Sequence, residues 1–255
     1  MKGITVFFLS MIMLASCRED QKRTTEQESY FIAPVYTDSV YFAVNEYFTD
    51  KISVEGEMPP FHQLEKAVHE TYFQRFVAKE GRFRKIHAIG TTIERYKRAL
   101  QDSIHTSHFD QYVKFDELGI FDGEPADPVG LIPLYAGRRV RLYEAWTPRV
   151  PVKIDFGSGM ANFRLAIDSA YTAGNNDLLV RVSVQFDGTL QLVQALHGAQ
   201  LTIQGKGWFT WNCTINQRRD THLSATYIAR KGNNKLTQQI TRSDTLIVYR
   251  NKLNF

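Results

Sequence analysis

Two pairs of histidines have helical spacings, and in the second pair, three residues apart, both rings could reach one metal ion. His62 and His69 are seven residues apart, and His105 and His108 form an HxxH pair. A structural or catalytic zinc ion needs at least a third protein ligand, and only scattered aspartates lie near the second pair. The chain has no HExxH, CxxC or P-loop motif. We therefore predict neither a metal site nor a cofactor.

A serine between two glycines is the nearest approach to a catalytic nucleophile. Gly157-Ser158-Gly159 lacks the longer Gly-x-Ser-x-Gly frame. It also lies between two predicted strands, whereas a nucleophile elbow needs a turn from a strand into a helix. We interpret the tripeptide as a hairpin turn and predict no catalytic residue.

Acidic residues gather in the proline-containing segment 116–127. Glycoside hydrolysis uses two carboxyl groups that face each other across a cleft, but spacing along a loop does not determine their separation. A hydrolase built on this segment is one hypothesis, and a solvated loop is the alternative. The acidic residues are Asp116, Glu117, Asp122, Glu124 and Asp127.

Three aromatic residues could form a ligand surface. The segment 207–216 alternates as a strand, with most of its apolar side chains and Cys213 on one face and Trp208 on the other. Together with Tyr143 and Trp146, Trp208 could bind a glycan. A packing contact with the N-terminal half of the chain is the alternative for these rings.

The N-terminal half has apolar residues at steps of three and four, which predicts helices. A predicted break at Gly81 separates two such runs, so residues 60–106 read as a helical hairpin or one broken helix. We predict a mainly helical region over residues 30–128. The first run is Phe61, Leu64, Val68, Tyr72 and Phe76, and the second is Ile86, Ile89, Ile93, Tyr96, Leu100 and Ile104.

After residue 135 the apolar period changes to two. Seven or more short strands, separated by turn residues, predict an antiparallel β-sandwich over residues 129–255. The spacing resembles that of immunoglobulin-like domains of bacterial envelope proteins, without the paired cysteines of antibody domains. The predicted fold class is therefore α+β. The turn segments are Gly157–Gly159, Gly174–Asp177, Asp187-Gly188 and Gly232–Asn234.

The first residues carry a targeting signal. Lys2 precedes an apolar run from Ile4 to Leu14, which is too short to cross a bilayer as a helix. Leu14-Ala15-Ser16-Cys17 resembles the lipobox of bacterial lipoproteins. The resemblance implies that residues 1–16 are removed and that Cys17 carries palmitate and other acyl chains, which anchor a protein stably. Residues 17–29 then form a flexible tether.

Two further features resemble lipoproteins of the Bacteroidota. Arg18-Glu19-Asp20 is similar to their surface-export signal. Asp-Ser or Asp-Thr followed by an aliphatic residue is similar to their O-glycosylation triplet, although such dipeptides also make caps and turns. The candidate acceptors are Ser39, Ser103, Ser169 and Thr245.

Charge and cysteine content narrow the function. A net charge of +4 does not by itself predict a nucleic-acid partner, and Cys213 has no second cysteine once Cys17 is acylated. We predict an outer-membrane lipoprotein, periplasmic or surface-exposed, that engages other envelope proteins. Its role is a non-enzymatic scaffold or accessory subunit, for example of a secretion system. A glycan-binding lipoprotein and an envelope hydrolase using segment 116–127 are the alternatives.

Overall fold

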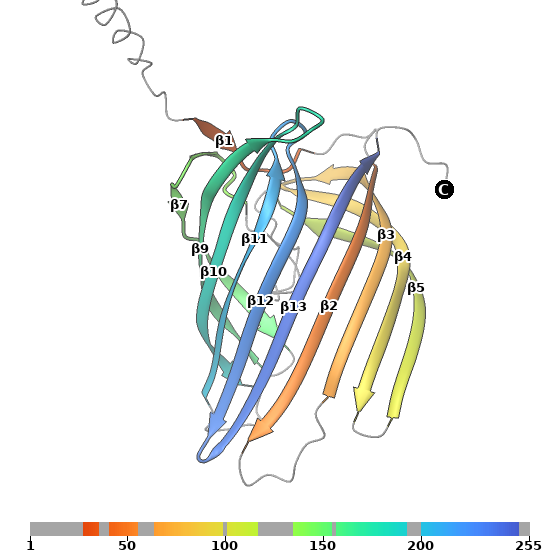
Figure 1. Ribbon diagram of the computed structural model, residues 1–255, viewed down its shortest axis with the longest axis vertical. Helices are drawn as coiled ribbons and strands as arrows, with labels where there is room; N and C mark the ends of the chain where they lie inside the picture. Colours follow the sequence, from red (N-terminus) through yellow and green to blue (C-terminus); the bar gives the residue numbers. More distant parts are fainter. Residues whose placement is uncertain are drawn as a thin grey trace, which may run out of the picture.

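The chain folds as an all-β protein built on one large antiparallel sheet (Figure 1). The computed structural model describes residues 28–35, 41–55, 64–98, 101–116, 135–154, 157–192 and 200–249. Within these ranges there is no helix, and hence none that could cross a membrane. Residues 1–17, predicted to hold a lipoprotein leader and its lipobox, lie outside the described residues.

Eleven strands form the large sheet, in the order β5-β4-β3-β2-β13-β12-β11-β10-β9-β7, with β8 also pairing with β9. A separate two-stranded sheet pairs β1 (Ser29–Phe31) with β6 (Arg139–Arg141). The strands of the large sheet are β2 (Tyr41–Glu55), β3 (Leu64–Glu80), β4 (Phe83–Arg98), β5 (Gln101–Phe115), β7 (Ala145–Trp146), β8 (Arg149–Ile154), β9 (Gly157–Thr172), β10 (Leu178–Leu192), β11 (Gln200–Asn212), β12 (Gln217–Lys231) and β13 (Asn234–Tyr249).

Cross-strand register divides the sheet into two faces. Val182, Phe209, Thr221 and Asp244 lie side by side across β10–β13, and all four are buried. We call the face that carries this row the inner face and the opposite one the outer face. The adjacent outer row, from Ser183 through Trp208, His222 and Ser243, consists mainly of polar residues.

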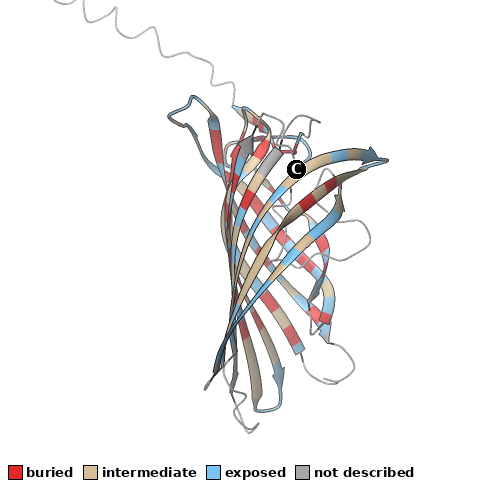
Figure 2. Ribbon diagram, turned by 90° about the vertical axis from the view of Figure 1, so that its right-hand side faces the viewer, coloured by how far each residue is buried: buried red, intermediate tan, exposed pale blue. Residues whose placement is uncertain are grey.

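The hydrophobic core lies against the inner face of β9–β12. Short segments outside these strands contribute almost completely buried side chains to it: Ile32 next to β1, Val140 of β6, and Val150 and Val152 of β8. Figures 1 and 2 show a strongly twisted sheet, as the handedness of β-strands requires, with buried positions alternating along its strands. The core therefore depends on short flanking strands as well as on the long ones.

The predicted helical region is wrong. Residues that recur every four positions share one face of a strand as well as one face of a helix. Val68 and Tyr72 are such a pair, and both lie on the inner face of β3. Lys66 and Glu70, which fall on the same face, are polar, so the two-residue alternation was hidden.

The joint between β3 and β4 is a tight hairpin. Only Gly81 and Arg82 separate the two strands, and Gly81 adopts a φ of 62°. Such a left-handed conformation favours glycine and is typical of two-residue hairpin turns. The break predicted at Gly81 is therefore a chain reversal between two strands.

The predicted antiparallel strands of the C-terminal half are confirmed, but the immunoglobulin-like sandwich is not what they form. Strands β9–β13 are 13 to 16 residues long and join β2–β5 in a single sheet. Asp187-Gly188, predicted to be a turn, lies inside β10. Glycine is present there because a Cβ atom at position 188 would crowd the backbone of Met160 and Ala161 on β9. Gly232 does form the predicted turn, between β12 and β13.

Glycines on the inner face of β11 allow neighbouring strands to pack closely. A Cβ atom at Gly205 would overlap the Phe186 ring, and one at Gly207 would overlap the carbonyl oxygen of His222. Glycine inside a strand commonly marks such a bend or close approach. These positions therefore require glycine for packing reasons rather than for an unusual φ.

We expect Gly207→Ala to lower the free energy of unfolding by about 1–3 kcal/mol, because backbone atoms of β12 must move. Gly174→Ala is the matched control: no atom lies within 4 Å of its added Cβ, and the change should be neutral or stabilising by up to ~1 kcal/mol. Urea unfolding followed by tryptophan fluorescence measures both. Equal stability of the two variants would contradict the packing argument.

Candidate functional site

The structure separates those histidines of the two pairs that it describes. His62 lies outside the described residues, and His69 stacks on Tyr47 with ring centroids 4.2 Å apart on the outer face. His105 and His108 fall on opposite faces of β5, because residues three apart in a strand point in opposite directions. No cluster of three or more potential ligands occurs among the described residues.

The serine and the acidic segment also do not assemble a catalytic group in the described part of the chain. Ser158 lies in β9 opposite Gln191 of β10, so the tripeptide predicted to be a turn is part of a strand. Asp116 is buried. The rest of the acidic segment, residues 117–127, lies outside the described residues, and the hydrolase hypothesis stays untested there.

The three predicted ligand aromatics do not share a surface. Trp208 lies on the outer face, with the Arg181 guanidinium 4.3 Å from its ring centroid. Trp146 is buried in the core on the inner face, opposite Leu165. Tyr143 is 75% exposed at a φ of 64° beyond the end of β6. A glycan surface made of these residues is therefore not assembled.

The lone cysteine and the candidate glycosylation residues are also placed. Cys213 packs against the core as a free thiol, and burial raises its pKa to about 11. A thiol with a raised pKa is a poor nucleophile. Ser103, Ser169 and Thr245 are exposed on strands, whereas Ser39 lies outside the described residues. Glycosylation of these residues stays a prediction.

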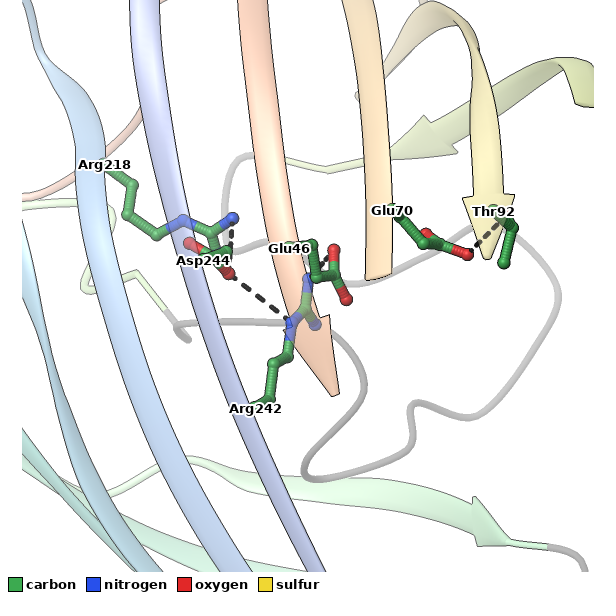
Figure 3. Close-up of polar contacts among 6 residues, drawn as sticks. All are labelled: Glu46, Glu70, Thr92, Arg218, Arg242 and Asp244. Carbon is green, nitrogen blue, oxygen red and sulfur yellow. Dashed lines mark hydrogen bonds and ion pairs between the residues drawn. The ribbon is translucent and has the colours of Figure 1, made fainter. Parts of the chain in front are cut away.

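A network of four charged side chains, missed from the sequence, crosses the inner face (Figure 3). Arg242 donates to Glu46 at 2.9 Å and lies 3.4 Å from Asp244. Arg218 contacts the same Asp244 oxygen at 3.2 Å. The two arginines and two carboxylates come from β2, β12 and β13, and their formal charges cancel. We call them the inner quartet.

The inner quartet is deeply buried, so its charged groups lose most of their contact with water. The side chains of Arg242 and Asp244 are 4% and 0% exposed. Burial raises the pKa of Glu46, and the attraction of Arg242 offsets this only in part. Among the described residues, Nη1 of Arg242 has no hydrogen-bond partner. The inner quartet is thus a cross-link between β2, β12 and β13 whose formal charges sum to zero.

We expect Asp244→Leu to destabilise the protein by about 3–5 kcal/mol, because two buried guanidinium groups lose their shared carboxylate. Adding Arg218→Met should recover part of this loss, since one of the unpaired charges is then removed. Thermal and urea unfolding measure both variants against Gln239→Ala, an exposed change on the same strand. A double variant less stable than the single one would refute the cross-link interpretation.

A pocket of about 670 Å³ lies across β13, β2, β3, β4 and β5. Its apolar wall on the outer face includes Phe73, Ile89 and Ile247. Gly90 also lines it, and a Cβ atom there would overlap Tyr72, so glycine lets β3 and β4 approach closely at this point. We call this cavity the outer pocket.

Polar groups line one side of the outer pocket. Asp110 lies 2.6 Å from Nε2 of His87, and His108 lies 3.0 Å from the Thr91 hydroxyl. Asp110 is the one carboxylate among the described lining residues. The pair of carboxyl groups that glycoside hydrolysis requires is therefore not present in this lining. Apolar walls with a few polar groups are typical of binding sites.

Exposed rings flank the outer pocket. Tyr47 is 51% exposed, Phe73 40% and Tyr112 57%, and register places all three on the outer face. Tyr112 stacks on His87 at a centroid distance of 4.6 Å. The site went unnoticed in the sequence because its residues come from five strands, four of which lie in the region predicted to be helical.

Comparison with known proteins identifies no family. No family model matches the chain, and no curated protein does. An outer membrane channel from Pseudomonas putida F1 is 9% identical, with a TM-score of 0.30 and coverage of 84% of this chain and 97% of that one. The β domain of the Bordetella autotransporter Brka is 12% identical, with a TM-score of 0.24 and coverage of 81% and 99%. Likenesses this low carry no argument about fold or role.

Proposed function

We propose that this protein is a lipid-anchored, non-enzymatic scaffold of the bacterial envelope that engages other envelope proteins. The lipobox is the observation that carries the proposal, because acylation of Cys17 would hold the chain at the outer membrane. Residues 17–28 can span at most about 40 Å when fully extended. The sheet that begins after this tether would therefore stay close to the lipid surface.

The outer face suits contact with partners in water. Its cross-strand pairs are mainly polar, as in the contacts of His69 with Asn45 and of His222 with Ser243. Such ladders stabilise a sheet while their side chains remain accessible. Long strands also give the face a continuous, ordered surface. An accessory subunit of a secretion system or a similar assembly fits this description.

We expect Cys17→Ala to abolish palmitate incorporation and to release the protein from the membrane fraction of its own cells. Metabolic labelling with a palmitate analogue, followed by fractionation, measures both effects. Cys213→Ser is the matched control and should stay labelled and membrane-bound, because Cys213 packs against the core. A labelled or fully membrane-bound Cys17→Ala variant would refute the lipid anchor.

The scaffold role has its own test. Cross-linking of the acylated protein in intact cells, followed by its isolation, should recover specific envelope proteins. Recovery of glycan alone, with no protein partner, would favour the second candidate function over the first.

The outer pocket favours glycan binding as that second candidate. Exposed rings beside hydrogen-bonding groups provide the two kinds of contact that a sugar needs, a flat apolar surface and directional polar partners. The pocket replaces the surface predicted from Trp208, Tyr143 and Trp146, since the fold brings the pocket residues together and keeps those three rings apart.

We expect Phe73→Ala to weaken binding of envelope polysaccharide by about tenfold, through loss of the aromatic wall of the outer pocket. Tyr143→Ala is the control, since Tyr143 is more exposed but distant in register from the pocket. Titration calorimetry with purified polysaccharide measures both. Equal affinities of the two variants and the unchanged protein would rule out the pocket as the glycan site.

A further inference from the structure

In the part of the chain that the structure describes, strand β5 ends the large sheet with an open edge. It pairs with β4 from Gln101 to Phe115 without a register shift, and no strand among the described residues pairs with its other side (Figure 1). Such an edge presents a row of backbone N–H and C=O groups that another strand can pair with.

The opposite edge of the sheet is protected. It consists of β7, with two residues, and β8, with six, and β8 contains the exposed Pro151. Short strands and proline are two of the means by which native sheets prevent edge pairing. Strand β5 has neither of these features, since its 15 residues contain no proline and no bulge. The protein thus protects one edge and leaves the other able to accept a strand.

The outer face of β5 has a nearly self-complementary order of side chains. Asp102 and Ile104 lie toward one end, Tyr112 and Lys114 toward the other, and His108 is in the middle. Ile104 is 69% exposed and Tyr112 57% exposed. Large apolar side chains at an open edge favour a partner that would cover them.

We propose that β5 pairs in antiparallel fashion with β5 of a second copy of this chain, around a two-fold axis at His108. In this register Asp102 faces Lys114 of the second copy, and Ile104 faces Tyr112 of the second copy. Opposite charges and aromatic–aliphatic pairs are the cross-strand neighbours that stabilise antiparallel sheets. Lys114 also contacts Glu80 of its own chain, so its charge would lie between two carboxylates.

The register is specific. A shift of one residue would set outer-face side chains opposite inner-face ones. A shift of two residues would place Ile104 opposite either Asp110 or Lys114. Only the register centred on His108 pairs the whole strand with itself and matches both ends. Because the same strand supplies both halves of each match, a second copy fits better than an unrelated strand.

The full acylated chain, extracted in mild detergent, tests the proposal. Light scattering should give about twice the mass of one chain. In a Cys213→Ser background, the His108→Cys variant should be linked to a second copy by a short thiol cross-linker, because directly opposed Cβ atoms lie about 4.5–5.5 Å apart. Gln239→Cys, exposed on the outer face of β13, should not be linked.

Disruption provides the second arm of the test. Ile104→Lys should raise the dimer dissociation constant by about tenfold or more, because a two-fold interface contains each substitution twice. Gln239→Lys, exposed on the outer face of β13 and away from the edge, should leave the dissociation constant unchanged. Each of three results would overturn the proposal: a monomeric protein without substitutions, a dimer that Ile104→Lys does not affect, or linkage of the His108→Cys variant to a different protein.

Discussion

The pairing of β13 with β2 is the interaction on which the rest of the sheet depends. It runs from Lys235 opposite Glu55 to Tyr249 opposite Tyr41 and joins strands from the two ends of the chain. Without it, β2–β5 would be separated from the strands that carry the core. The inner quartet spans this seam, with Glu46 on β2 and Arg242 on β13. A buried ion pair loses much of its Coulomb attraction to the cost of removing both charges from water, so the inner quartet is weak evidence for added stability.

The two parts of the sheet bury their inner faces differently. Over β9–β12 the inner face is mainly apolar, with Thr221 and Arg218 of β12 as exceptions, and it is closed by β1, β6, β7 and β8. Over β2–β4 it carries polar side chains that satisfy one another, such as Glu70 with Thr92 and Glu94 with Tyr96. The outer face is mainly polar in both parts, with the outer pocket as an apolar interruption. The two surfaces proposed to bind partners, the outer pocket and the β5 edge, thus lie away from the inner face, whose side chains stabilise the fold.

Prediction from the sequence succeeded where alternation was regular. In β10, Val180, Val182, Val184 and Phe186 are buried as their spacing indicates. It failed where polar residues face inward. Lys66 and Glu70 interrupt the apolar alternation of β3. They can face inward because Glu94 and Thr92 of β4 are their partners, and these partners cannot be recognised from the sequence of β3 alone. A four-residue recurrence then favoured a helix, since the pattern does not distinguish the two structures without those partners.

The resemblance of residues 14–17 to a lipobox stays a prediction. The sequence by itself determined the antiparallel strands of the second half, the turn at Gly232 and the burial of Phe209 and Trp211. These features depend on neighbouring residues or on one strand's own alternation. Only the tertiary structure decided the single sheet, the inner quartet, the outer pocket and the open edge of β5. Each of these arises from register between strands that are far apart in the chain, and a register is set by side chains that meet only after folding.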